Sequence, residues 1–110
     1  MSLEIFRKKY TYWIMNIVND NPGIDINGII KLIGKEEDIT HKIAIITIRT
    51  LELKTNEIIR VEFDPPKIIN GPMGPVEYRQ PHYYITQLGE KCLTYMREVA
   101  SRLEELEGEE

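Results

Sequence analysis

The stretch YYITQLGEKCL, residues 83–93, describes the passage of a strand into a helix. The aromatic and β-branched residues that open it favour a strand. Thr86 can leave that strand and cap the coming helix through its hydroxyl oxygen, and Gly89, which has no Cβ, permits close approach of another backbone. Cys92 or Leu93 then restarts the core. The stretch therefore predicts a tightly packed strand-to-helix junction.

The helix that follows carries one apolar stripe. From Leu88 onward the apolar positions are separated by alternating steps of four and three residues, the spacing of a helix that pairs with another helix. We expect a helix over residues 88–107 that mediates dimerisation. The residues of this stripe are Cys92, Met96, Val99, Leu103 and Leu106. We expect Cys92 to act as a small buried hydrophobe rather than as a redox sensor.

The residues before the junction predict an antiparallel hairpin. Residues 57–63 alternate apolar and charged side chains as a strand does, and residues 81–86 form the returning strand. The stretch between them, residues 64–81, holds five of the six prolines, so we expect an irregular, extended loop. We expect its apolar side chains to belong to a packed loop; the alternatives are that they fold over a neighbouring surface, pack against a partner subunit or form an exposed interaction patch. These side chains are Ile68, Ile69, Met73 and Val76.

Helical patterns fill the N-terminal half. Apolar residues at spacings of three and four predict a first helix over residues 5–19, which Pro22 ends. Asp25 can cap a short second helix that runs through Leu32 and stops at Gly34.

The third helical segment is ambiguous. Asp38 can cap a helix over residues 39–54. At 100° per residue that helix is apolar on two sides. One side carries Ile39, Ile43, Ile46 and Leu53, and the other carries Ala44, Ile45, Ile48 and Leu51. The many β-branched residues leave a strand that turns at residues 54–56 as an open alternative.

Composition is that of a single globular domain spanning residues 1–110, with 42% hydrophobic and 29% charged residues. One cysteine excludes an intramolecular disulfide and favours a reducing, cytoplasmic location. No apolar run is long enough for a membrane span, so we expect no membrane partner.

Acidic and basic residues are equal in number over residues 1–88, and the net charge of −4 arises in the tail, residues 89–110. The acidic balance therefore does not exclude a nucleic-acid partner for the rest of the chain.

The predicted order of elements resembles a winged helix-turn-helix domain, an α+β fold of three helices and a two-stranded β-hairpin wing, with an added C-terminal helix. Residues 83–93 resemble the Tyr-x-Leu-Thr-x-x-Gly-x-x-x-Leu run in PadR, MarR and related prokaryotic, especially archaeal, regulators. Residues 48–52 and 58–60 are similar to the end of the recognition helix and the strand after it. The chain departs from the pattern in a recognition helix with few basic or amide side chains and in a longer, proline-rich wing.

The resemblance implies a sequence-specific transcriptional regulator that binds double-stranded DNA as a homodimer and needs no cofactor. The helix over residues 39–54 would enter the major groove, and the wing would lie on the backbone or in the minor groove. The candidate DNA contacts are Thr40, His41, Lys42, Thr47 and Arg49 on the helix, with Lys67 and Arg79 on the wing. The alternative is a winged-helix protein-interaction module without DNA binding, which the weakly basic helix and the apolar wing support. Neither a catalytic residue set nor histidine or cysteine at metal-ligand spacing is present, so no enzyme and no metal site are predicted.

Overall fold

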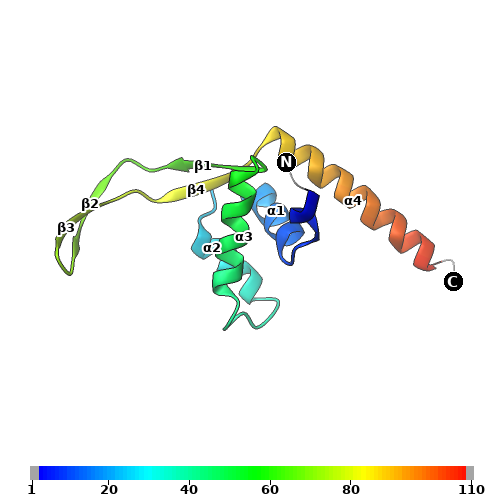
Figure 1. Ribbon diagram of the computed structural model, residues 1–110, viewed down its shortest axis with the longest axis horizontal. Helices are drawn as coiled ribbons and strands as arrows, with labels where there is room; N and C mark the ends of the chain where they lie inside the picture. The colour runs from blue at the N-terminus through cyan, green and yellow to red at the C-terminus, as the bar shows by residue number, and fades with distance from the viewer. Residues whose placement is uncertain (1–2, 109–110) are drawn as a thin grey trace.

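A computed structural model describes residues 3–108 as a helical body from which two arms project (Figure 1). The elements are η1 (Leu3–Arg7), α1 (Thr11–Asp20), α2 (Ile26–Gly34), α3 (Ile43–Thr55), β1 (Ile59–Phe63), β2 (Lys67–Gly71), β3 (Gly74–Tyr78), β4 (Pro81–Ile85) and α4 (Gln87–Gly108). The β-strands form one arm and α4 forms the other, on the opposite side of the body. The molecule measures 63 × 31 × 23 Å along its principal axes, so much of its surface lies on the arms.

The core lies in the body, where α1, α2 and α3 pack against one another and against the bases of both arms. Isoleucine is the most frequent of its fully buried side chains, and each gains roughly 1.5–3 kcal/mol from burial. They include Ile14, Met15, Val18, Ile29, Ile33, Ile46, Leu53, Ile58, Ile59 and Leu93. The arms therefore depend on the body at their bases, while their outer parts contribute little to the core.

The first predicted helix is wrong in its bounds. The expected helix over residues 5–19 is two elements, η1 and α1, because Tyr10 adopts the left-handed conformation at φ 74° and interrupts the ladder. The buried hydroxyl of Thr11 donates to the Ile5 carbonyl at 2.6 Å across this turn. Tyr10 itself is buried, and its hydroxyl donates to Glu37 Oε2 at 3.2 Å. These tertiary contacts accompany a break that the apolar spacing does not reveal.

The second helix is confirmed with its cap, since Asp25 Oδ1 accepts from the Gly28 backbone N–H at 2.7 Å. The third segment is a helix, which excludes the strand alternative, but it begins at Ile43 rather than at residue 39. The predicted cap by Asp38 is wrong for this helix. Asp38 Oδ1 instead accepts from the backbone N–H of Thr40 at 3.0 Å and stabilises a separate turn ahead of α3.

The predicted hairpin is confirmed: β1 pairs antiparallel with β4, from Ile59 opposite Ile85 to Phe63 opposite Pro81. The irregular loop predicted over residues 64–81 is wrong, because β2 and β3 form a second antiparallel hairpin there. Lys67 lies opposite Tyr78, and the chain reverses after Gly71. A two-stranded ribbon consists only of edge strands, so its prolines remove no essential hydrogen bond. The prolines of residues 64–81 are therefore compatible with strands, although their number predicts a loop.

The strand-to-helix junction has the predicted chemistry. Thr86 Oγ1 accepts from the Gly89 backbone N–H at 2.9 Å, and the same hydroxyl donates to the Glu57 carbonyl at 2.6 Å. A Cβ on Gly89 would lie 2.2 Å from the Ile58 carbonyl oxygen, so only glycine fits. Leu93 is 1% exposed and anchors the first turns of α4 in the core. This contact fixes the direction in which α4 leaves the body.

Candidate nucleic-acid interface

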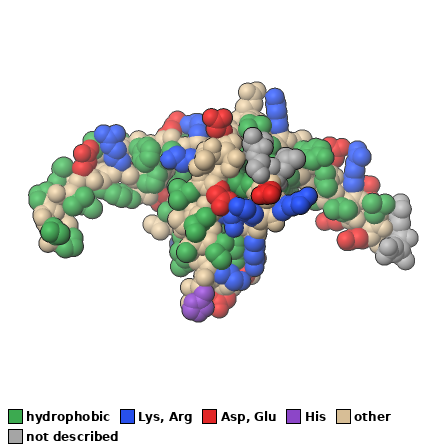
Figure 2. Space-filling view, viewed as in Figure 1, with side chains coloured by type: hydrophobic (Ala, Val, Ile, Leu, Met, Phe, Trp, Pro, Cys, Tyr) green, Lys and Arg blue, Asp and Glu red, His purple; other side chains and the backbone are tan. Residues whose placement is uncertain are grey.

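Helix α3 has one buried side and one exposed apolar side. Ile46, Thr50 and Leu53 face the core. The opposite side carries Ala44, Ile48 and Leu51, with Ile43 and Ile45 at its borders; we call these five residues the α3 face. Its four large side chains are 42–51% exposed. Hydrophobic side chains accordingly occupy much of the lower column that α2 and α3 form in the space-filling view (Figure 2).

Arg49, a predicted DNA contact, is held by the protein itself. Its side chain is 13% exposed. Its Nε donates to the Lys9 carbonyl at 3.1 Å, and its Nη1 donates to Glu52 Oε2 at 2.8 Å. Glu52 also pairs with Lys8 at 3.2 Å. Arg49 therefore joins α3 to the segment before α1 and is not presented on the α3 face.

The three candidates at the expected start of the helix lie in the loop before it. Thr40 donates its hydroxyl to Asp38, a hydrogen bond that helps hold the pKa of Asp38 below its usual range. The Nζ of Lys42 lies 3.3 Å from Glu37 Oε2. His41 is exposed. The candidates are brought together, but two of them already have acidic partners.

Thr47 is the remaining candidate on α3, and it is half-buried. Its hydroxyl donates to the Ile43 carbonyl at 2.9 Å, one turn earlier in the same helix. The hydroxyl proton is thus already used within the helix.

The two wing candidates lie together at the base of the β2–β3 hairpin. Lys67 begins β2, is exposed and makes no ion pair within residues 3–108. Arg79 follows β3, and its Nη2 lies 3.6 Å from Glu77 Oε1. The hairpin itself is uncharged from Ile68 to Val76. Within the β2–β3 hairpin, basic side chains therefore lie only at its base.

The apolar side chains of the wing are exposed rather than packed over the body. Ile68 is 73% exposed, and Met73 at the turn is fully exposed. Ile69 and Val76 lie directly opposite each other, and each is about half exposed. The expected packed loop is therefore wrong, and the single chain has the exposed patch that was the alternative.

Two exposed lysines that sequence reasoning missed lie in the connection ahead of α3 and in its last turn. Lys35 follows α2 and Lys54 lies in the last turn of α3; both are exposed, and neither makes an ion pair in the described part of the chain. The sequence alone only weakly indicates that these two lysines are unpaired. Most basic residues have acidic neighbours in the chain, and only the fold shows which acidic side chains they contact.

A polar network that was not predicted fixes the base of the wing to the body. His82 Nε2 lies 3.0 Å from Asp64 Oδ1, and His82 Nδ1 lies 2.8 Å from the Gly23 carbonyl oxygen. The hydrogen bonds to Asp64 and then to Gly23 raise the pKa of His82. Gln80 Nε2 also donates to Asp25 Oδ2 at 2.9 Å, beside the start of α2. The arm is thus held where it meets the turn between α1 and α2.

The predicted dimerisation stripe on α4 divides into two parts. Cys92 and Met96 are half-buried against the body, and burial raises the pKa of the Cys92 thiol, as suits a packing role. Val99, Leu103 and Leu106 are 40–62% exposed. The inner part of the stripe thus packs within the chain, and only the outer part is free.

The outer part of the stripe borders an apolar groove of about 330 Å³ between α4, α1 and η1. We call its lining residues the α4 groove: Phe6, Tyr12, Tyr95, Met96, Val99, Ala100 and Leu103. Tyr10 is in the core and is not among the residues that line the groove. The neighbouring Tyr12 lines the groove instead, because the break at Tyr10 shifts which side of the segment faces outward.

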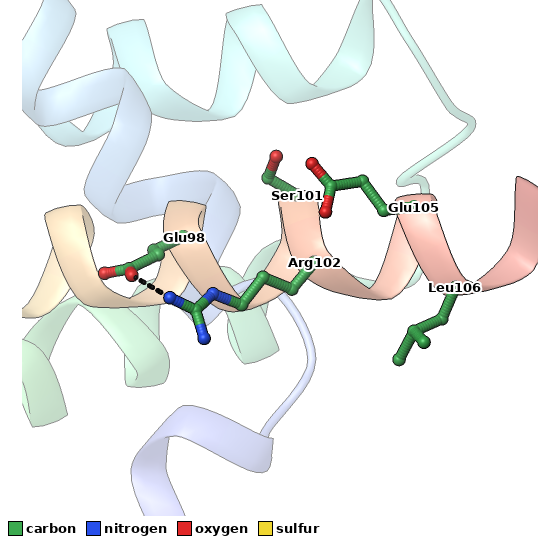
Figure 3. A pocket seen from close by; sticks show the side chains of 5 residues that line it. All are labelled: Glu98, Ser101, Arg102, Glu105 and Leu106. Atoms are coloured by element: carbon green, nitrogen blue, oxygen red, sulfur yellow. Dashed lines mark hydrogen bonds and ion pairs between the residues drawn. The ribbon is translucent and has the colours of Figure 1, made fainter.

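A second hollow, which four polar side chains and Leu106 line, lies on α4 alone (Figure 3). Its lining side chains all come from that helix, and Arg102 Nη2 donates to Glu98 Oε1 at 2.9 Å. A hollow formed by one helix surface has no opposing wall to hold a ligand. The part of the chain that the structure describes has no group of three or more His, Cys, Asp or Glu arranged to hold a metal ion. None of the helices between residues 3 and 108 is long and apolar enough to cross a membrane.

The fold is that of solved transcriptional regulators. The chain matches a crystal structure of a Streptococcus transcriptional regulator with a TM-score of 0.67 and 13% identity, over 97% of each chain. It matches a PadR-like transcriptional regulator from Bacillus cereus with a TM-score of 0.66 and 12% identity, over 96% of this chain and 94% of that one. No family model and no curated protein matches the sequence. The α+β winged-helix fold with an added C-terminal helix is confirmed.

Proposed function

We propose that this protein is a DNA-binding transcriptional regulator that acts as a homodimer, with α3 in the major groove and the wing on the DNA backbone or in the minor groove. One observation carries the proposal: its structural neighbours are transcriptional regulators, and the likeness covers nearly the whole chain, α4 included. A likeness limited to the three-helix body would support only a shared scaffold.

The dimensions and charges of α3 support its placement in DNA. Its 13 residues span about 20 Å, and the α3 face is exposed along most of that length. The major groove, about 12 Å wide, admits such a helix. Lys54 in the last turn of α3 and Lys35 in the connection ahead of α3 are available for phosphates, and Lys67 and Arg79 serve the same role at the base of the β2–β3 hairpin. Thr40, His41 and Lys42 meet the backbone from the loop ahead of α3.

The α4 arm supports the homodimer. The outer half of α4 has no buried residue, and a helix that projects alone into water is marginally stable. The α4 groove presents an almost wholly apolar lining next to it. The α4 of a second copy, which carries the same free stripe of Val99, Leu103 and Leu106, fits this groove and covers both surfaces. A two-fold dimer sets two α3 helices about 34 Å apart and predicts a palindromic site.

The test is a fluorescence-anisotropy titration of the full chain against labelled duplexes that tile the DNA upstream of its own gene, at two salt concentrations. We expect tight binding to one or a few tiles that weakens steeply with salt, because lysine–phosphate contacts release counterions. Weak, equal binding to every tile at low salt would overturn the proposal. The exposed apolar α3 face would then favour the protein-interaction module.

A further inference from the structure

The α3 face has no hydrogen-bonding side chain with which to read bases. Its members are four isoleucine or leucine side chains and one alanine. At its margin the Thr47 hydroxyl donates to the Ile43 carbonyl, and Arg49 is held by Lys9 and Glu52. Guanine is normally recognised by Arg or Lys and adenine by Asn or Gln. Neither kind of contact is available from this face.

An apolar face can still read one feature of the major groove. The C5-methyl group of thymine is the apolar group that the base pairs present there. Ala44, Ile48 and Leu51 follow one another at spacings of four and three residues, so they rise by about 10 Å along the helix. That length corresponds to roughly three base-pair steps of 3.4 Å each. Three neighbouring side chains can therefore contact methyl groups on neighbouring base pairs.

The charges around the α3 face favour DNA over a protein helix as its occupant. Lys54, in the last turn of α3, and Lys35, in the connection that precedes α3, are exposed and unpaired in the described part of the chain, so both can meet phosphates. The acidic residue within α3, Glu52, is neutralised by Lys8 and Arg49. The α4 groove is the better binding surface for a protein helix, because it is an apolar hollow lined by aromatic side chains from three elements.

We propose that α3 selects A·T-rich operator DNA by apolar contact between Ala44, Ile48 and Leu51 and the methyl groups of thymine. The inference rests on the proposed function, because it requires α3 to enter the major groove. Methyl recognition by the α3 face makes Ile48, at the centre of that face, the main specificity-determining residue.

The experiment removes those methyl groups and nothing else. A tight-binding duplex is first selected from a random pool with the full-length protein. It is then synthesised again with deoxyuridine in place of thymidine, which keeps the base pairing and the hydrogen-bonding edge. We expect an A·T-rich selected site, and affinity that falls roughly four-fold for each contacted methyl group, the value of burying one such group.

A variant pair assigns the effect to α3. Ile48→Ala removes an exposed side chain and leaves the core intact, so it is expected to bind the thymidine duplex more weakly and to lose part of the difference between the two duplexes. Leu88→Ala, which shortens a side chain of similar exposure at the start of α4, is the matched control and keeps the full difference.

The outcomes separate the two proposals. Equal affinity for the thymidine and deoxyuridine duplexes, or a selected site rich in G·C pairs, overturns methyl recognition and leaves the regulator standing. A deoxyuridine effect that Ile48→Ala and Leu88→Ala retain equally places the methyl contact on another element and overturns the assignment to α3. Failure to select any duplex overturns the proposed function and the inference with it.

Discussion

Helices α3 and α4 both present apolar side chains to water, but their surroundings differ. The α3 face is a stripe on a single helix, with the unpaired Lys54 in its last turn and the unpaired Lys35 in the connection that precedes it. The exposed stripe of α4 instead continues into a groove that η1 and α1 help to form, lined by Phe6, Tyr12 and Tyr95. Exposed apolar area by itself does not identify a partner. The neighbouring charges favour DNA for α3, and the aromatic-lined groove favours a protein helix for α4.

The largest expected effect comes from placing charge in the α4 groove. Val99→Glu together with Leu103→Glu should raise the dimer dissociation constant on the order of a hundredfold, because two carboxylates would be buried among apolar side chains. Sedimentation-equilibrium centrifugation measures that constant.

The matched control places the same two charges on the other side of α4. Thr94→Glu together with Ser101→Glu changes exposed residues outside the groove and should leave the dimer intact. Equal loss in both double variants would show that charge on α4, rather than the groove, controls association.

The direction in which α4 leaves the body can be tested at Gly89. Gly89→Ala should lower the free energy of unfolding by about 2 kcal/mol, because its Cβ would overlap the Ile58 carbonyl oxygen and force α4 away from β1. Chemical denaturation followed by circular dichroism measures the change. Gly108→Ala, a helical position with nothing within 4 Å of the added Cβ, is the control and should not destabilise the protein. Similar losses at both positions would contradict the close-packed junction.

A smaller effect distinguishes the charges around α3 from those on α4. Lys54→Gln should weaken DNA binding a few-fold and reduce the slope of log affinity against log salt by about one, as expected for one lost phosphate contact. Lys91→Gln removes an exposed, unpaired lysine of α4 and should leave both quantities unchanged. If Lys91→Gln reduced the slope as much as Lys54→Gln, the DNA would not be centred on α3.

The smallest effect concerns the base of the wing. The pKa of His82 is raised in the folded protein by its hydrogen bonds to Asp64 and to the Gly23 carbonyl, and Asp25 adds to the effect. The stability that this contact adds is therefore complete below the unfolded pKa of about 6.5 and is lost as the pH rises through the higher folded pKa.

Thermal unfolding of the wild type and of His82→Gln across pH 5.5–8.5 tests this. The two melting temperatures should converge as the pH rises, with wild type the more stable at the acidic end. A difference that stays constant over this range would mean that the protonated ring is not what holds the arm.

The sequence predicted those parts of the fold whose chemistry is local. Thr86, Gly89 and Leu93 lie within eight residues of one another, and each has the predicted role. The cap of α2 by Asp25 is equally local and was also predicted correctly. The left-handed Tyr10 depends on packing against residues far along the chain, so periodicity alone extended one helix through the break.

The candidate site was less predictable than the fold, because availability is a tertiary property. Arg49 has the residue type of a DNA contact, but its side chain is occupied by the Lys9 carbonyl, 40 positions earlier in the chain. Lys54 lacks such a partner only because the fold brings none near it. The prediction of an irregular loop over residues 64–81 is wrong because it relies on the frequency of proline in loops, whereas a two-stranded ribbon tolerates proline.

Hydrogen–deuterium exchange tests the central claim most directly. That claim is that α3 binds DNA while the outer half of α4 binds a second copy of the chain. Exchange is measured with and without the selected duplex at one fixed protein concentration. Added DNA should slow exchange in peptides covering residues 35–55 and the base of the wing, and leave residues 99–106 unchanged. Protection confined to residues 99–106, or no protection anywhere at saturating duplex, would contradict the assignment of partners to the two helices.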